Sequence, residues 1–142
     1  GDVKFFKRPS YELSFLHDNA IDVVFMSNFS EHLRSKQELV DTFIEARRIL
    51  KVGGRLIILG PNIRYAYKIY WDFFDHHIPL SDKGVCEVLR AINFKIDEII
   101  PRFLPFTTKS RFPKNAIAIR LYLKMPFIWP ILGRQMFIVA SK

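Results

Sequence analysis

The chain has 142 residues, enough for one domain with a hydrophobic core, because 49% of its residues are apolar and 14 are phenylalanines. A single cysteine, Cys86, rules out an intrachain disulfide and favours a reducing compartment such as the cytoplasm. The sequence has no run of about 18 uncharged apolar residues, which argues against a membrane-spanning helix.

The net charge of +8 is unevenly distributed. Residues 1–100 carry 14 basic and 14 acidic side chains, whereas residues 101–142 carry eight basic side chains and no acidic ones. Such a one-sided field attracts phosphates, nucleic acid or anionic lipid headgroups. A solvated basic surface without a partner explains the same pattern equally well.

The first elements of the chain read as two strands and a helix. Val3–Phe6 is compatible with a short strand, and Ile21–Met26, which is rich in β-branched residues, predicts a buried strand. Ser35 is suited to cap a helix, and Glu38 three residues later completes a capping box. Apolar residues at helical spacing then predict an amphipathic helix over Lys36–Lys51.

The next strand is Leu56–Leu59, a continuous apolar run typical of a strand covered on both faces. Gly53 and Gly54 before it supply the positive φ angles that close a helix, and Gly60-Pro61-Asn62 ends the strand. Together with the preceding strand and helix, this run predicts a right-handed βαβ unit. Ligands of open α/β sheets bind beyond the carboxyl ends of such strands, so residues 60–62 are the first place to expect chemistry.

The second half of the chain alternates helical and strand patterns. The first predicted elements are a helix capped by residues 79–82 and ending near Asn93, and a strand at Lys95–Ile100. A basic loop at Pro101–Pro113 leads to a helix at Asn115–Met125, which is followed by the helix breakers Pro126 and Pro130. The final predicted strand is Met136–Ala140. The expected fold is therefore α/β, a mostly parallel sheet with flanking helices and one antiparallel strand near the carboxyl terminus.

Several segments together resemble the class I S-adenosylmethionine-dependent methyltransferases. They are Ile21–Asn28 with Glu31-His32-Leu33, then Ala46–Leu56, then Gly60-Pro61-Asn62. The resemblance implies that these are the family's fourth strand, the helix after it and its fifth strand, within a Rossmann-like sheet. It also implies S-adenosylmethionine as cofactor and methyl transfer as activity.

The sequence departs from that family in lacking its Gly-rich turn and the acidic residue that ends its second strand. Residues 1–142 are therefore expected to form a single, incomplete methyltransferase-like domain, inactive as given, with a basic helical insertion at about residues 101–134. The resemblance also implies an unpaired edge on the Ile21–Met26 strand. We expect this edge to recruit a second copy, giving a homodimer, or to pair with Val3–Phe6.

The predicted cofactor-binding residues follow from the resemblance. Ser27, Asn28 and Phe29 would lie along the methionine and ribose of the cofactor, and Ser10 occupies the region that usually reads the adenine. Ordinary capping of a strand end by Ser and Asn is the alternative.

Glu31 and His32 are the predicted catalytic pair. Imidazole is suited to take a proton from a hydroxyl group near neutral pH, and methyl transfer needs an aligned nucleophile. The alternative, weighted equally, is that the two residues only begin the next helix.

The predicted substrate-binding residues follow the Leu56–Leu59 strand, where the family builds its acceptor pocket. They are Asn62, Arg64, Tyr65, Trp71, His76 and His77. Aromatic side chains in this region can stack on a ring, a sugar or a base, but at helical spacing they can equally belong to the core.

Asp75-His76-His77 are candidate metal ligands together with Glu31 and His32, because carboxylates and imidazoles are suitable ligands. These residues, with Pro61-Asn62, faintly resemble the small-RNA 3′-terminal 2′-O-methyltransferases, whose metal is held by two Glu and two His. Asn28 stands where the first of those Glu residues would be, so no metal is predicted.

Three functions fit the sequence. The first is methyl transfer to a small-molecule, glycan or lipid-linked acceptor. The second is an RNA 2′-O-methyltransferase, suggested by the basic last third and ranked lower, and the third is a non-catalytic fragment that dimerises and binds no cofactor. The basic segment Arg102–Lys124 has three interpretations. It rests on an anionic membrane surface with the help of Phe127–Trp129, it forms a lid over the active site, or it is a helix packed on the sheet with its basic residues outward. The packed helix is favoured.

Overall fold

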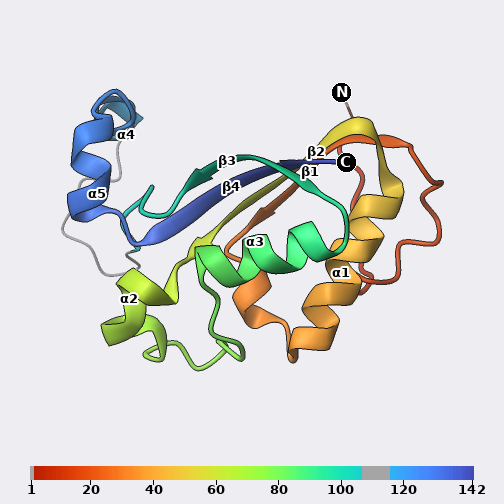
Figure 1. Ribbon diagram of the computed structural model, residues 1–142, viewed down its shortest axis with the longest axis horizontal. Coiled ribbons are helices and arrows are strands. Elements are labelled where there is room, and N and C mark those ends of the chain that lie inside the picture. Colours follow the sequence, from red (N-terminus) through yellow and green to blue (C-terminus); the bar gives the residue numbers. More distant parts are fainter. Residues whose placement is uncertain (1, 107–115) are drawn as a thin grey trace.

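A computed structural model describes residues 2–106 and 116–142 of the chain. Its centre is a four-stranded mixed sheet in the order β1-β2-β4-β3. The strands are β1 (Ile21–Ser27), β2 (Leu50–Pro61), β3 (Lys95–Ile100) and β4 (Gln135–Ser141). The helices are α1 (Lys36–Ile49), α2 (Ile63–Tyr70), α3 (Asp82–Ala91), α4 (Ala116–Leu123) and α5 (Trp129–Leu132), with 3₁₀ turns at Ser30–His32 and Pro126–Ile128. Figure 1 shows α1 and α3 on the same side of the sheet, and α4 and α5 beyond one end of it.

The predicted βαβ unit is confirmed, because β1 and β2 are parallel neighbours joined by α1. The helix begins where the capping signal placed it: the backbone N–H of Glu38 donates to the Ser35 hydroxyl at 3.1 Å. The Glu38 carboxylate reaches back and accepts from the backbone N–H of Arg34 at 2.8 Å, one residue before the cap. Local hydrogen bonding therefore sets the start of α1.

The role predicted for Gly53 is wrong. The helix ends at Ile49 and the chain enters β2 directly at Leu50, so no glycine closes the helix. Gly53, with φ 77°, instead lies inside β2, where the register with β1 shifts between Ile21 and Val23. The glycine thus accommodates an irregularity of the parallel ladder, a role that glycine commonly has in strands.

The amino-terminal expectations are also partly wrong. Val3–Phe6 is not a strand, and the ring of Phe6 stacks on Phe15 with centroids 4.5 Å apart. Among the described residues β1 pairs only with β2, so Val3–Phe6 does not cover its edge. β1 is present as predicted but is not buried throughout, because Val23 and Phe25 are 51% and 60% exposed.

The remaining strands follow the prediction. β4 lies antiparallel between β2 and β3, which supplies the expected antiparallel pairing near the carboxyl end. Helix α3 is capped by Ser81, whose hydroxyl accepts from the backbone N–H of Gly84 at 3.1 Å. The predicted loop at residues 101–113 lies largely outside the described residues.

Helix α4 contradicts the favoured expectation of a helix packed on the sheet. None of its residues is buried, and Figure 1 shows it away from the sheet. No helix among the described residues is both long and apolar enough to cross a bilayer.

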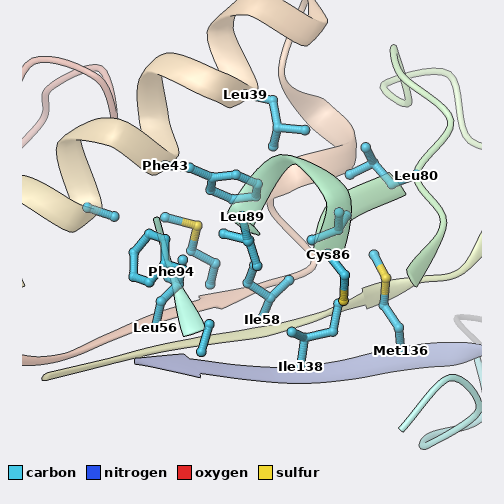
Figure 2. Packing of buried hydrophobic residues seen from close by; sticks show 14 of the residues in the cluster. Leu39, Phe43, Leu56, Ile58, Leu80, Cys86, Leu89, Phe94, Met136 and Ile138 are labelled. Carbon is cyan, nitrogen blue, oxygen red and sulfur yellow. The ribbon is translucent and has the colours of Figure 1, made fainter. Parts of the chain in front are cut away.

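The hydrophobic core lies between the sheet and the pair α1 and α3 (Figure 2). Leu39 and Phe43 of α1 and Leu89 of α3 pack toward Ile58 of β2 and Ile138 of β4. Cys86 is buried in the same core with a free thiol. A smaller cluster joins Ala66 and Tyr70 of α2 to Phe106.

Candidate functional site

Three strands bring residues to the end of the sheet where the parallel strands β1 and β2 have their carboxyl termini. The parallel strands β1 and β2 end there at Ser27 and Pro61, and the antiparallel strand β4 begins there, with Gln135 opposite Pro61. A pocket of about 320 Å³ lies at this end of the sheet, and we call it the strand-end pocket. It is lined by Asn28, Glu31, His32, Phe73, Asp75, His76, Phe106 and Gln135.

Glu31 is a buried carboxylate in this pocket. It lies in the 3₁₀ turn after β1 and is 1% exposed. A Cβ atom built on Gly60 would stand 3.4 Å from Oε2 of Glu31, so the carboxylate lies close to the backbone of β2. Burial raises the pKa of this carboxyl group, opposed by a hydrogen bond with its own backbone and by His32.

His76 is brought to Glu31 by backbone hydrogen bonding. The backbone N–H of the next residue, His77, donates to the Glu31 carbonyl at 2.9 Å. The His76 ring stacks on Phe73 with centroids 5.0 Å apart and meets the edge of Tyr70 at 4.8 Å. Burial, and next the neighbouring His32, lower the pKa of His76 and favour its neutral form.

His32 is oriented by the loop after α2. Its Nδ1 lies 2.9 Å from the backbone oxygen of Asp75 and 3.2 Å from that residue's carboxylate. A carbonyl oxygen can only accept, so Nδ1 carries a proton, and in the neutral imidazole the lone pair is on Nε2. Nε2 faces Oε1 of Glu31 at 3.8 Å.

Several polar atoms of this pocket have no hydrogen-bond partner among the described residues. They are Oε1 of Glu31, Nδ1 of His76 and Oε1 of Gln135. A carboxylate oxygen of Glu31 and one ring nitrogen each of His32 and His76 lie within 4.8 Å of one another. Gln135 was missed by sequence reasoning, because only the register of β4 brings it to this end of the sheet.

Two of the predicted substrate-binding residues have structural roles. The Asn62 side chain donates to Asp82 at 2.8 Å and to the backbone oxygen of Pro101 at 3.0 Å, and it accepts from the backbone N–H of Arg64. The guanidinium of Arg64 donates to both carboxylate oxygens of Asp82, at 2.9 and 3.1 Å. These bonds tie the end of β2 to the start of α3.

The other predicted substrate-binding residues are spread over the surface, apart from His76. The guanidinium groups of Arg64 and Arg102 lie 5.2 and 4.9 Å from the centroid of the Tyr65 ring, and Tyr65 lines a separate pocket of about 260 Å³. Trp71 and His77 are exposed and line none of the pockets described here. Of the six, only His76 lines the strand-end pocket with Glu31 and His32.

The predicted cofactor-binding residues divide between two pockets. Ser10, Ser27 and Phe29 line a mostly apolar pocket of about 490 Å³ between β1 and α1, which we call the β1-edge pocket. The Ser10 hydroxyl is 2.8 Å from that of Thr42, which already donates to the Glu38 carbonyl, so Ser10 is the donor. Asn28, with φ 45°, turns instead into the strand-end pocket.

Comparison with known proteins supports the family resemblance. Residues 2–58 match the model of a methyltransferase domain. No curated protein sequence matches the chain. Among solved structures, a SAM-dependent methyltransferase from Archaeoglobus fulgidus superimposes with a TM-score of 0.70 at 19% identity, covering 96% of this chain and 66% of its own.

Two further structures share the fold. A SAM-dependent methyltransferase from Methanosarcina mazei gives a TM-score of 0.70 at 17% identity, covering 100% of this chain and 68% of its own. The [4+2]-cyclase SpnF gives 0.61 at 18% identity, covering 94% and 54%. The fold thus also supports chemistry other than methyl transfer, so function has to be argued from the site.

The match and the fold confirm the resemblance to the class I S-adenosylmethionine-dependent methyltransferases, in part of that domain. The chain spans 66% of the length of the Archaeoglobus fulgidus chain. The expected α/β, Rossmann-like fold that lacks some family strands is therefore confirmed as well.

The residues that line the β1-edge pocket suit the rings and the chain of S-adenosylmethionine but not its charged groups. The β1-edge pocket offers apolar walls from Met26 and Phe29, suited to the rings and chain of the cofactor. Its hydroxyl groups come from Ser10, Ser27 and Thr42, and no charged side chain lines it. The charged amino and carboxylate groups of the cofactor therefore find no ionic partner among the residues that line this pocket.

Proposed function

We propose that this chain forms the acceptor side of an S-adenosylmethionine-dependent methyltransferase acting on a hydroxyl group of a small molecule, glycan or lipid-linked compound. The observation that carries the proposal is the strand-end pocket. Glu31, His32 and His76 converge there, beside the end of β1, with polar atoms that the protein leaves unpartnered. The match to a methyltransferase domain supports the reaction class.

The cofactor, when bound, supplies an electrophilic methyl group that needs an acceptor atom in line with it. In the proposal, Ser27 and Phe29 contact the cofactor from the β1-edge pocket, and Asn28 separates this side from the acceptor side. An acceptor hydroxyl in the strand-end pocket would form hydrogen bonds with Gln135 and His76, which line that pocket and each have an unpartnered polar atom.

His32 is the group placed to take the proton of that hydroxyl. Its Nδ1 donates to the Asp75 carbonyl, which leaves the Nε2 lone pair on the pocket side. The Glu31 carboxylate, 3.8 Å from Nε2, would stabilise the imidazolium that forms. Asp75 acts as a positioning residue through the same hydrogen bond.

The proposal places the protein in the cytoplasm. The only support is the free, buried thiol of Cys86, which is typical of proteins from reducing compartments.

Calorimetric titration of the chain with S-adenosylhomocysteine, with light scattering on the same sample, tests the cofactor part of the proposal. We expect saturable binding. Absence of binding would contradict cofactor recognition by this chain, and the light scattering would show whether a bound state is monomeric or dimeric.

The variant His32→Asn tests the acceptor part. Its amide can keep the hydrogen bond to the Asp75 carbonyl but has no counterpart of Nε2. We expect methyl transfer to hydroxyl acceptors to fall by about 10²–10⁴-fold with unchanged S-adenosylhomocysteine binding. The exposed neighbour variant His77→Asn is the control, and equal losses in both variants would contradict a role for Nε2.

A further inference from the structure

The strand-end pocket contains a buried carboxylate without a strong counter-charge. Glu31 is 1% exposed, and the only positively ionisable group within 4.0 Å of its carboxylate, among the described residues, is His32 at 3.8 Å. A buried carboxylate is unfavourable unless it is paired or coordinates a metal. Its Oε1 atom also lacks a hydrogen-bond partner, which indicates that a ligand is expected at this position.

Two imidazole nitrogens complete a set of possible ligands around this carboxylate. Nδ1 of His76 is buried and unpartnered, and one ring nitrogen of His76 belongs to the group of atoms that lie within 4.8 Å of one another. Nε2 of His32 faces Oε1 of Glu31 with its lone pair free, because Nδ1 donates to the Asp75 carbonyl. A backbone carbonyl that accepts from the second ring nitrogen is the usual support of a metal-binding histidine.

We propose that Glu31, His32 and His76 bind a divalent transition-metal ion in the strand-end pocket. One carboxylate and two imidazoles suit Zn²⁺ and its neighbours better than Mg²⁺ or Ca²⁺, which prefer oxygen ligands. Three protein ligands leave a coordination position open, and Gln135, whose Oε1 is unpartnered, lines the same pocket.

The metal site is inferred from the three side chains alone. What a bound ion would do to an acceptor rests on the proposed function. An acceptor hydroxyl at the open position would lose its proton more readily to solvent or buffer because the ion stabilises the alkoxide. With the ion bound, Nε2 of His32 would be a ligand, and the role of His32 as proton acceptor applies to the metal-free chain. The geometry of the three side chains does not depend on which reaction follows.

The test is calorimetric titration of the metal-free 142-residue chain with ZnCl₂, together with the visible absorption of the Co²⁺-loaded protein. We expect binding of one ion per chain and Co²⁺ bands that report nitrogen and oxygen ligands. The variants His76→Phe and His32→Asn should bind Zn²⁺ at least about 10-fold more weakly. His17→Asn, which removes an exposed histidine outside the pocket, should bind as the unmodified chain does.

The variant His76→Phe separates a lost ligand from a lost fold. Phenylalanine keeps the stacking on Phe73 but removes the unpartnered nitrogen together with the hydrogen bond between the ring and the Tyr70 backbone, so its thermal midpoint in EDTA measures how much stability the metal-free variant retains. Unchanged Zn²⁺ affinity in this variant, or no stoichiometric binding by the unmodified chain, would overturn the inference.

Titration with S-adenosylhomocysteine in EDTA keeps the two proposals distinguishable. Cofactor binding without any Zn²⁺ binding would overturn the metal site and leave the proposed function standing. Zn²⁺ binding that depends on His76, without cofactor binding, would support the metal site and contradict the proposed cofactor.

Discussion

Tyr70 and Trp71 are neighbours in the sequence with opposite environments. Tyr70 is 0% exposed, and its hydroxyl donates to the Ile78 carbonyl at 2.7 Å and accepts from the backbone N–H of Leu80 at 3.2 Å. Burial raises its pKa to about 12. Trp71 is 56% exposed and contacts the Tyr70 ring edge-on, with centroids 5.2 Å apart. The two side chains should therefore contribute very differently to stability.

Urea unfolding of Tyr70→Phe and Trp71→Ala tests this difference. Tyr70→Phe leaves two buried backbone groups without a partner, and we expect a loss of about 1–3 kcal/mol. Trp71→Ala removes an exposed ring and one aromatic contact, and we expect about 1 kcal/mol. A loss of about 3–5 kcal/mol for Trp71→Ala would instead place this residue in the core.

At the scale of elements, α4 and the turns after it form an exposed apolar and basic surface. The exposed side chains include Ile117, Ile119, Leu121, Leu123, Phe127 and Ile131. Arg120 and Lys124 are exposed within the same stretch, and residues 101–142 contain no acidic side chain. This combination is the one expected of a segment that rests on an anionic membrane surface.

Co-sedimentation with vesicles tests the membrane surface. We expect enrichment on phosphatidylserine-containing vesicles and none on pure phosphatidylcholine. Reversing two charges in Arg120→Glu with Lys124→Glu should weaken binding at least about tenfold, since each basic residue near the surface contributes about 1 kcal/mol. Lys83→Glu on α3 is the matched control. No enrichment of the unmodified chain at physiological salt would exclude this partner.

At the scale of the whole molecule, the sheet is open along β1. In the part of the chain that the structure describes, this strand has β2 on one side only, and Val23 and Phe25 leave apolar surface exposed. Exposed strand edges of this kind recruit another chain unless they are blunted by charge or covered. Self-association through β1 therefore stays a prediction of the fold.

Sedimentation velocity over a range of concentrations tests self-association. We expect a concentration-dependent dimer that Phe25→Lys suppresses, because a charge on the edge strand opposes pairing. Ile44→Lys changes an apolar residue of similar exposure on α1 and should leave the dimer intact. A monomer at all concentrations would contradict the prediction.

The sequence by itself determined most of the strands and helices and the class of fold. The caps at Ser35 and Ser81 were predictable because each depends on a hydrogen bond to a residue three positions later. The strands β1 to β4 were predictable because apolar runs and alternation are local patterns. Glu31 and His32 were identified because they directly follow a strand end, where ligands of α/β sheets collect.

Only the tertiary structure decided which residues join that pair. His76 reaches Glu31 through a backbone hydrogen bond between distant segments, and Gln135 arrives through the antiparallel register of β4 with β2. Asn62 and Arg64, which the strand-end argument also selected, are instead held by Asp82. Sequence spacing sets what a helix or strand does within a few residues, whereas the meeting of side chains from different segments depends on sheet order, register and burial, which are properties of the packed chain.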